Sequence, residues 1–322
     1  MARQRYENVE PESFDRPRRR TRPRTKDRPT YEDAVDAVVV TVDRGRYTCA
    51  VEDRTVSAMK SRPLGRKGVV VGDRVRLVGD VSGGDGTLAR IVEVSDRTTV
   101  LRRTADDSDP VERVIVANAD QLVIVTALAD PEPRVGLIDR ALVAAYDAGL
   151  TPILCLTKAD LASPEELLAV YRPLGVESVA TRKGTDPVEL RRRLTGHTSV
   201  LVGHSGVGKS TLVNALIPGA QRETGEVNAV TGRGRHTSTS AVMLPLEDGW
   251  IIDTPGIRSF GLAHVDEARL MAAFPDLEAL TESCPRGCTH TSDAPECALD
   301  EGDPGRVESY RRLLAARAAP WA

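Results

Sequence analysis

The sequence predicts an α/β protein in which an OB-like β-barrel precedes a parallel α/β domain and a helical region follows it. Three observations indicate this fold class. Short β-branched runs separated by glycine and aspartate fill residues 34–103, continuous apolar runs then alternate with helical stretches, and cysteines gather near the end of the chain. The 322 residues are enough for two or three such units.

The barrel is predicted from the β-branched runs and the turns between them. The runs lie at 38–42, 47–51, 69–78 and 88–101, and turn residues occupy 43–45, 72–73 and 83–86. Five short strands in about 70 residues suit an OB-like fold, and an SH3-like barrel would give much the same pattern.

After Pro110 the pattern becomes that of β-α-β units. Apolar strands are expected at 122–126, 153–156 and 198–202, as in a parallel sheet covered on both faces, with helices at 137–148 and 165–171. Helices return from about Asp266, and the last is expected at 307–318. We expect a basic head at 1–33, the barrel at 34–104, the α/β domain at 105–263 and the final helical domain at 264–322.

Composition limits the class of protein. Five cysteines are too few for a disulfide framework, and neither a secretory signal nor a bilayer-length apolar run of roughly 20 residues is found. We therefore expect a cytoplasmic protein. The net charge is -3, yet the first 30 residues hold ten Lys or Arg against five Asp or Glu, which predicts a disordered head that adds salt-dependent affinity for a polyanion. The alternative is a solvated tail without a partner.

A phosphate-binding motif follows the strand expected at 198–202. Glycine backbone N–H groups, a lysine and a helix N-terminus are what such a loop needs to hold phosphates, and the serine hydroxyl suits magnesium. A helix is expected at 211–217. The predicted nucleotide-binding residues of this P-loop are Gly203, His204, Ser205, Gly206, Val207, Gly208, Lys209, Ser210 and Thr211.

A second motif follows the apolar run 250–252. Asp253, at the end of this strand, is expected to hold magnesium, and the backbone amide of Gly256 is expected to reach the γ-phosphate. DxxG is a weak signal alone and a strong one after a P-loop. We expect Lys209, Asp253 and Gly256 to take part in catalysis.

The third motif, Thr157, Lys158 and Asp160, is similar to the guanine-reading N-K-x-D sequence with threonine in the asparagine place. The Asp160 carboxylate can accept hydrogen bonds from both guanine N–H donors, which adenine does not offer. The alternative is a surface Lys-Ala-Asp with Asp160 as a helix cap.

This motif precedes the P-loop, whereas in an ordinary GTPase it follows. Either the match is accidental, or the chain is circularly permuted while its sheet is kept, which we favour. Residues 179–181 are then expected to supply a second guanine contact. The chain leaves the nucleotide domain just after Gly256, so the C-terminal region is expected to respond to the nucleotide state.

The C-terminal cysteines predict a zinc site. Cys284, Cys288, His290 and Cys297 provide three thiolates and an imidazole within 14 residues, a set that selects zinc over harder metals. The remaining cysteines, Cys49 and Cys155, fall in predicted strands and are expected to be core residues.

Together these motifs resemble the ribosome small-subunit-dependent GTPase family (RsgA) over about residues 34–318. The resemblance implies an OB-fold domain, a circularly permuted P-loop GTPase domain and a C-terminal helical zinc-binding domain. It also implies a role in late maturation of the small ribosomal subunit, with 16S rRNA as partner. Within the family's switch I motif, which falls on 234–239, it places a magnesium ligand at Ser238, beside Thr237 and Thr239. Ile257 stands where Ras-like proteins carry the water-orienting glutamine, and the resemblance gives that role to His236.

Two functions remain open at this point. One is a GTP hydrolase, expected to be monomeric, that docks on rRNA and is stimulated by the subunit. The other is a nucleotide-gated RNA-binding or chaperone module with incidental hydrolysis, and a P-loop kinase would leave two motifs unexplained. The arginines near the end of the barrel either contact RNA phosphates or form an ordinary solvated face; they are Arg97, Arg102, Arg103 and Arg113.

Overall fold

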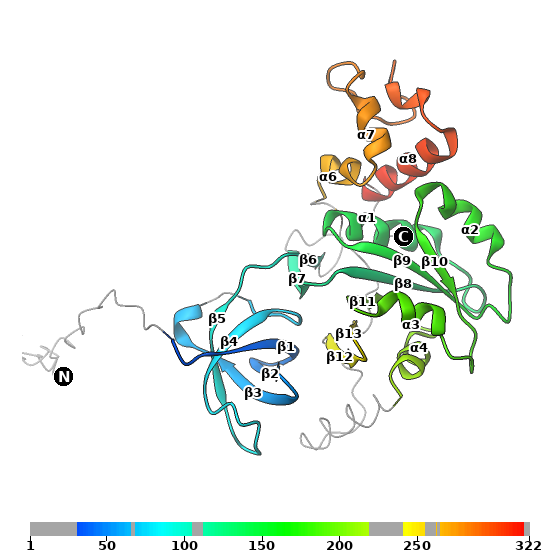
Figure 1. Ribbon diagram of the computed structural model, residues 1–322. Coiled ribbons are helices and arrows are strands. Elements are labelled where there is room, and N and C mark those ends of the chain that lie inside the picture. Colours follow the sequence, from blue (N-terminus) through cyan, green and yellow to red (C-terminus); the bar gives the residue numbers. More distant parts are fainter. Residues whose placement is uncertain are drawn as a thin grey trace, which may run out of the picture. The chain divides into compact units, whose positions relative to one another are not determined.

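The computed structural model describes residues 31–65, 68–104, 112–218, 241–254, 262 and 265–318. Its first part is a closed barrel in which β1 pairs with β2, β2 with β3, β3 with β5, β5 with β4, and β4 with β1 (Figure 1). The OB-like prediction is therefore confirmed. The strands are β1 (Val35–Asp43), β2 (Arg46–Val51), β3 (Arg54–Lys60), β4 (Arg74–Gly79) and β5 (Ala89–Val94).

Two details of the barrel differ from the prediction. Strand β3 was not among the predicted runs, because only Val56 and Ala58 of its residues are buried and polar side chains fill the places between. The run 88–101 is not one strand: β5 ends at Val94, and a new strand begins at Val100. Between them Arg97 forms an ion pair of 2.7 Å with the fully buried Asp73, so this arginine stabilises the barrel.

A hairpin of β6 (Val100–Thr104) and β7 (Glu112–Ala117) follows the barrel. Val116 pairs with Val71, and the Ala117 N–H donates to the Val71 carbonyl at 3.0 Å. Gly72 is needed beside this contact, because its φ is +88° and a Cβ there would lie 2.0 Å from the Ala117 carbonyl oxygen.

The second part is a sheet in the order β10-β9-β8-β11-β13-β12. The first five strands are parallel, and β12 is antiparallel to β13. The strand before the P-loop, β11, lies between β8, which comes earlier in the chain, and β13, which comes later. This order is the predicted permutation. The strands are β8 (Gln121–Ala127), β9 (Thr151–Thr157), β10 (Glu177–Ala180), β11 (Thr198–Val202), β12 (Val242–Leu246) and β13 (Gly249–Asp253).

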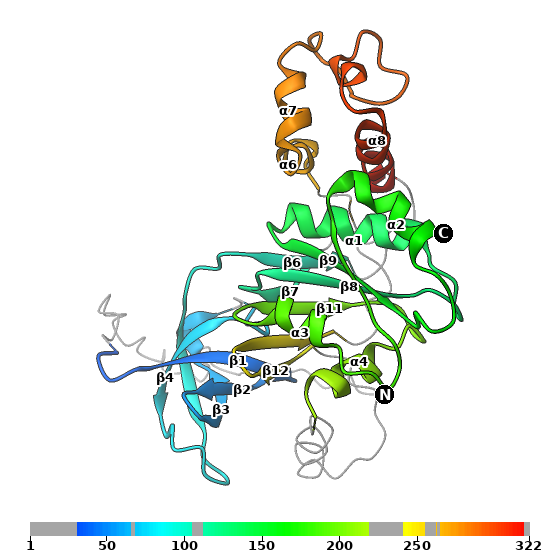
Figure 2. The same cartoon turned by 45° about the vertical axis from the view of Figure 1, so that its right-hand side comes forward.

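Helices cover both faces of this sheet (Figures 1 and 2). Helix α1 belongs to one apolar core, and helices α3 and α4 belong to another. Strand β8 is buried along its whole length, as a central parallel strand requires. The helical elements are α1 (Val135–Asp147), α2 (Glu165–Tyr171), α3 (Val188–Leu194) and α4 (Lys209–Leu216), with 3-10 turns η2 (Arg62–Leu64) and η3 (Arg172–Leu174).

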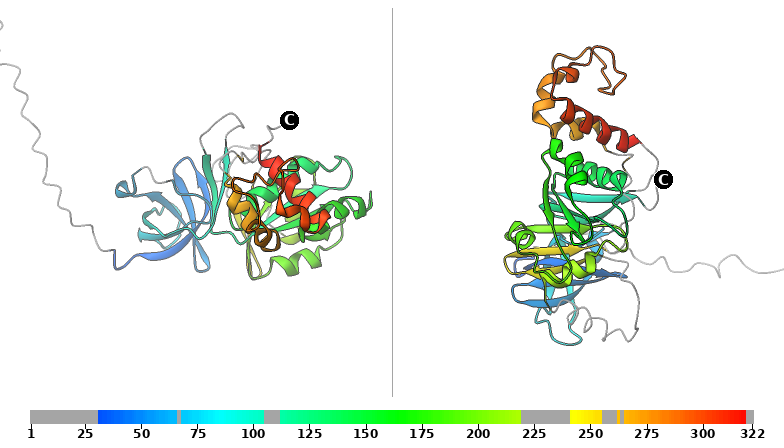
Figure 3. Two further views of the ribbon diagram at one scale, coloured as in Figure 1. Left: turned by 90° about the horizontal axis from the view of Figure 1, so that it is seen from above. Right: turned by 90° about the vertical axis from the view of Figure 1, so that its right-hand side faces the viewer.

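The C-terminal region is helical, as predicted. It comprises α6 (Glu267–Ala272), α7 (Pro275–Thr281), η4 (Ala298–Glu301) and α8 (Pro304–Ala318). The ring of Phe274 packs edge-on against Tyr146 of α1 and Tyr310 of α8. Helix α8 therefore lies against α1 (Figure 3). Among the helices that the structure describes, none has the length and apolar character to cross a bilayer.

Candidate functional site

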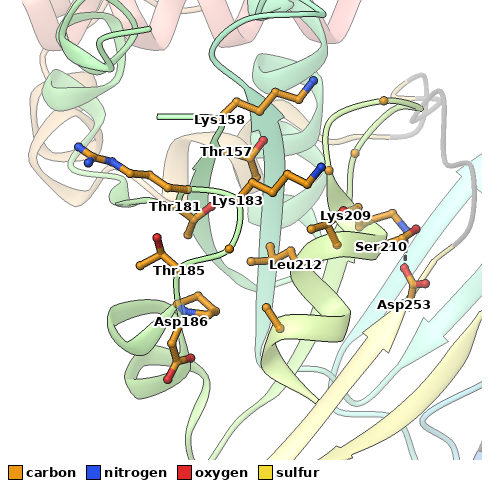
Figure 4. A pocket seen from close by; sticks show the side chains of 18 of the residues that line it. Thr157, Lys158, Thr181, Lys183, Thr185, Asp186, Lys209, Ser210, Leu212 and Asp253 are labelled. Carbon is orange, nitrogen blue, oxygen red and sulfur yellow. Dashed lines mark hydrogen bonds and ion pairs between the residues drawn. The ribbon is translucent and has the colours of Figure 1, made fainter. Parts of the chain in front are cut away.

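A cavity of about 1230 Å³ lies where the parallel strands reach their carboxyl ends (Figure 4). In an open α/β sheet this edge is where ligands bind. The loops after β9, β10 and β11 contribute to its wall, together with the last residue of β13. Its lining includes Thr157, Lys158, Thr181, Arg182, Lys183, Gly184, Thr185, Asp186, Gly203, His204, Ser205, Gly206, Gly208, Lys209, Ser210, Thr211 and Asp253.

The P-loop conformation depends on its glycines. Gly208 has a φ of +87° at the N-cap of α4, a left-handed conformation that other residues rarely adopt. At Gly203 a Cβ would lie 2.5 Å from the Val125 carbonyl oxygen of β8. Val207 turns away from the cavity and is fully buried. The loop therefore turns directly from β11 into α4, with the helix N-terminus facing the cavity.

Lys209, Ser210 and Asp253 lie together at one end of the cavity (Figure 4). The Lys209 ammonium forms an ion pair with the Asp253 carboxylate. The hydroxyl of Thr254, next to Asp253, donates to the Leu201 carbonyl at 2.6 Å and fixes the end of β13 beside β11. This end of the cavity thus combines an ammonium group, a hydroxyl, a carboxylate and a helix N-terminus.

The same end fits a nucleotide-bound magnesium ion. Magnesium prefers oxygen ligands and is usually held by one or two protein groups together with phosphate oxygens and water. The Ser210 hydroxyl and the Asp253 carboxylate line one cavity and offer such oxygens. A magnesium ion held by these oxygens would neutralise negative charge on a phosphate-bearing ligand.

The other end of the cavity is formed by the loops after β9 and β10. The buried Thr157 hydroxyl donates to the Val207 carbonyl of the P-loop at 2.5 Å, so the motif after β9 is tied directly to the phosphate-binding loop. The Ala159 N–H donates to the Thr181 carbonyl at 3.1 Å and joins the two loops. Lys158 extends across to the Asp130 carbonyl.

The guanine-reading residues that the sequence predicts are only partly brought together. Thr157 and Lys158 line the cavity, whereas Asp160 is exposed and is not part of the lining. Of the three residues at 179–181, only Thr181 lines it, because Val179 is buried in the sheet. No sequence motif marks the rest of this wall, residues 182–187.

Arg191 of α3 was also missed by sequence reasoning. Its guanidinium donates to the Leu216 carbonyl at 2.5 Å and to the Ala215 carbonyl at 3.1 Å, so it caps the C-terminus of the P-loop helix. It also pairs with Asp186 at 2.8 Å. A cation at this position satisfies carbonyls that α4 leaves free and stabilises the helix dipole.

The predicted metal ligands gather in the loop between α7 and α8. The ligand atoms of Cys284, Cys288, His290 and Cys297 lie within 4.8 Å of one another. His290 Nδ1 is 3.7 Å from the Cys284 sulfur and 3.8 Å from the Cys297 sulfur. With metal–sulfur and metal–nitrogen bonds of about 2.3 and 2.0 Å, a tetrahedral site has sulfur–nitrogen edges of about 3.5 Å. The four residues therefore fit a zinc ion bound through Nδ1 of the histidine.

The groups around these ligands suit thiolates. The Ala298 N–H donates to the Cys284 sulfur at 3.3 Å, and the His290 N–H to the Cys288 sulfur at 3.5 Å. Arg311 of α8 donates to the His290 carbonyl at 3.1 Å, which fixes the loop to the last helix. Such surrounding hydrogen bonds orient metal ligands.

The other cysteines do not belong to this cluster. Cys49 and Cys155 are fully buried in strands, and burial raises the pKa of each thiol to about 12. Thiols in this state are unreactive core residues, as predicted. His236, Ser238 and its neighbours Thr237 and Thr239, Gly256 and the basic head at 1–30 lie outside the described residues.

Comparison with known proteins agrees with this geometry. Residues 94–263 match the family described as RsgA GTPase. The Small ribosomal subunit biogenesis GTPase RsgA of Pseudomonas syringae pv. tomato is 43% identical over 263 residues, which cover 77% of this chain and 74% of the relative. The crystal structure of YloQ, a circularly permuted GTPase, superposes with a TM-score of 0.64 at 22% identity, covering 92% of this chain and 100% of that one. YjeQ from Thermotoga maritima does so with a TM-score of 0.59 at 24% identity, covering 89% and 100%.

Proposed function

The chain belongs to the RsgA GTPase family, and we propose that it hydrolyses GTP to GDP and phosphate in the biogenesis of the small ribosomal subunit. The observation that carries this proposal is the single cavity whose wall includes Thr157 and Lys158 at one end and Lys209, Ser210 and Asp253 at the other. A guanine nucleotide needs both ends at once, because its base and its terminal phosphate lie at opposite extremes.

The proposed roles of the residues follow from their chemistry. The P-loop amides and Lys209 bind the phosphate oxygens, and Ser210 and Asp253 hold the magnesium ion. Thr157 keeps the base-binding loop in register with the P-loop, and Asp160 accepts from guanine after its exposed side chain turns inward. In hydrolysis the bond from γ-phosphorus to the β,γ-bridging oxygen breaks with its electron pair left on GDP, while a water oxygen bonds to phosphorus and gives its proton to the phosphate product.

We assign His236 to orient the attacking water and Ser238 and the Gly256 amide to the γ-phosphate end, on the family motifs alone. His236→Ala is expected to retain GTP affinity and to lose stimulated hydrolysis, measured as phosphate release with small subunits present. Unchanged stimulated turnover in this variant would remove the histidine from the mechanism.

The cellular location, the oligomeric state, the RNA partner and the metal are also proposals. We propose that the chain is a cytoplasmic monomer that binds 16S rRNA late in maturation, and that the Cys₃His cluster holds structural zinc. We also propose the domain limits 34–104, 105–263 and 264–322. The pairing of β6, at the end of the first range, with β7, in the second, makes the hairpin the link between them.

Multiple-turnover GTP hydrolysis with and without purified small subunits tests the proposal. Strong stimulation by the subunits is expected. If GTP binds but the subunits leave turnover at its basal level, the chain acts instead as a nucleotide-gated RNA-binding module. Replacing GTP by ATP is the matched control, and equal turnover of the two nucleotides would contradict guanine recognition.

A further inference from the structure

The hairpin β6–β7 brings an arginine into the nucleotide cavity that no motif of the sequence marks. Arg103, the fourth residue of β6, lines the same cavity as Lys209, Ser210 and Asp253. It is separated from the P-loop by about a hundred residues of sequence. Only the folded chain places these groups around one space.

The path of the hairpin explains how Arg103 reaches this edge. At the end of the ladder where Val100 faces Ala117, the Asn118 N–H donates to the Thr99 carbonyl at 3.0 Å, and Asp120 follows two residues later. The Asp120 backbone is hydrogen-bonded to Thr151 and Thr198, the first residues of β9 and β11. This end therefore lies at the amino edge of the parallel sheet. The opposite end, with Arg103, lies toward the carboxyl edge, where the cavity is.

The position of the hairpin along the strand order of the sheet indicates that Arg103 lies toward the phosphate end of the cavity. On one side, strand β6 contacts α1, the helix that packs on β8 and β9. On its other side the hairpin meets Val71, whose neighbour Gly72 is hydrogen-bonded to β1, and β1 in turn pairs with β12. The hairpin thus lies on the β11, β13 and β12 side, where the P-loop and Asp253 are.

Charge around the hairpin also points to an anionic ligand. Arg103 stands directly opposite Arg113 in the register, and like charges in facing positions destabilise a strand pair. Among the described residues, no carboxylate forms an ion pair with either arginine. The cavity lining contains six cationic and two anionic side chains, a difference of four positive charges. Both carboxylates, Asp186 and Asp253, are already paired, with Arg191 and Lys209.

We propose that Arg103 binds the terminal phosphate of GTP and stabilises the negative charge that develops as the bond to the β,γ-bridging oxygen breaks. This inference rests on the proposed GTPase function. A guanidinium supplied from within the same chain can hold γ-phosphate oxygens through two parallel N–H donors, and the charge it neutralises is greater in the transition state than in the ground state. It makes no such contact with GDP.

The experiment compares Arg103→Ala, Arg103→Lys and the control Arg113→Ala, which removes the same charge from the same hairpin at an exposed position outside the cavity lining. Single-turnover hydrolysis without ribosomes and the affinities for GDP and a non-hydrolysable GTP analogue are measured. For Arg103→Ala we expect hydrolysis to fall at least about 100-fold and analogue affinity about tenfold, with GDP affinity within about twofold. Arg103→Lys is expected to restore analogue affinity more than hydrolysis, and Arg113→Ala to match the wild type.

Equal loss of GDP and analogue affinity in Arg103→Ala, or equal effects of Arg103→Ala and Arg113→Ala, would overturn the assignment. So would unchanged nucleotide binding and hydrolysis with weaker binding to small subunits, which would make Arg103 an RNA contact. Failure of the wild type to hydrolyse GTP contradicts the proposed function instead, and the analogue-to-GDP affinity ratio then still decides whether Arg103 meets the terminal phosphate. Far-ultraviolet circular dichroism verifies that each variant is folded.

Discussion

The P-loop and the metal-binding loop, here residues 282–297, are both short ligand-binding loops. The backbone determines the shape of one, and side chains determine the shape of the other. The P-loop connects β11 directly to α4, Gly206 and Gly208 adopt conformations that other residues avoid, and Val207 anchors it in the core. The metal-binding loop contributes few buried apolar side chains, and its cysteine and histidine side chains converge on one point. The backbone determines the first loop, and the side chains determine the second.

This difference implies different dependence on ligand. A loop held by a strand, a helix and buried contacts keeps its shape without phosphate. A loop whose main shared contact is a set of metal ligands gains its stability from the ion, because folding and metal binding are one process there. The two regions should therefore respond separately when the metal is removed.

Metal removal tests this separation and has the largest expected effect. Structural zinc contributes an apparent binding free energy of about 10 to 16 kcal/mol at neutral pH, so Cys288→Ser or chelation should unfold the metal-binding loop and loosen α7 and α8. Hydrogen exchange should increase across 275–318, while GDP affinity stays within about threefold. Thr289→Ala, an exposed neighbour of His290, is the control and should retain one zinc per chain. Loss of GDP binding in parallel with zinc would show that the two regions are not independent.

The next largest effect concerns the ion pair that joins α1 of the α/β domain to α8 of the C-terminal region. Asp139 of α1 is buried and accepts from Arg312 of α8 at 3.0 Å, and Arg312 also lies over the Tyr171 ring. Removing one partner of such a buried pair costs about 3 to 5 kcal/mol, so Arg312→Ala should lower the free energy of unfolding by about that amount. Chemical denaturation with and without zinc measures it. A loss below about 1 kcal/mol would mean that this ion pair contributes little and that other contacts hold α8 to α1.

The pH dependence of Arg312→Ala sharpens this test. Burial raises the pKa of the Asp139 carboxyl, and Arg312 opposes the increase. Without Arg312 the folded-state pKa rises further above the unfolded value of about 3.9. The folded variant then binds the proton more tightly, so the stability contributed by protonated Asp139 is present at low pH and is lost as the pH rises through the folded-state pKa. The deficit relative to the wild type should therefore be larger at pH 8 than at pH 5.

Lys209→Ala addresses the loop that the backbone shapes. It removes the ammonium group that faces Asp253 but leaves the glycines and α4 unchanged, so GTP and GDP affinity should fall about 100-fold while the loop stays folded. Fluorescent nucleotide titration gives the affinities. Zinc content should be unaffected, and the thermal midpoint should change by only a few degrees. Unfolding of α4 in this variant would show that the lysine, rather than the backbone, maintains the P-loop.

Sequence motifs were sufficient where local chemistry determines the structure. The P-loop, the permuted strand order and the four metal ligands each depend on residues close together in the chain or on fully apolar strands. Motifs were insufficient where the structure depends on contacts between residues far apart in the chain. Strand β3 hides its two buried side chains among polar ones, and nothing local to Arg103 indicates that its hairpin ends at the nucleotide cavity. Asp160 is the opposite case. Its motif marks it as a guanine-binding residue, but its side chain is exposed in the structure.

The smallest expected effect concerns Thr157, which connects the two ends of the nucleotide cavity. Its hydroxyl donates to the Val207 carbonyl at 2.5 Å from a buried position, in the place where related motifs carry asparagine. Thr157→Val keeps the shape but leaves that carbonyl without its partner, which costs about 1 to 3 kcal/mol of stability. Thr157→Ser retains the hydroxyl and is the control. If the hydroxyl aligns the base-binding loop with the P-loop, the valine variant should also lose about tenfold in affinity for GDP, and the serine variant should not. Equal nucleotide affinity of the valine and serine variants would confine Thr157 to a role in stability, and the P-loop would then be shaped without help from the base-binding loop.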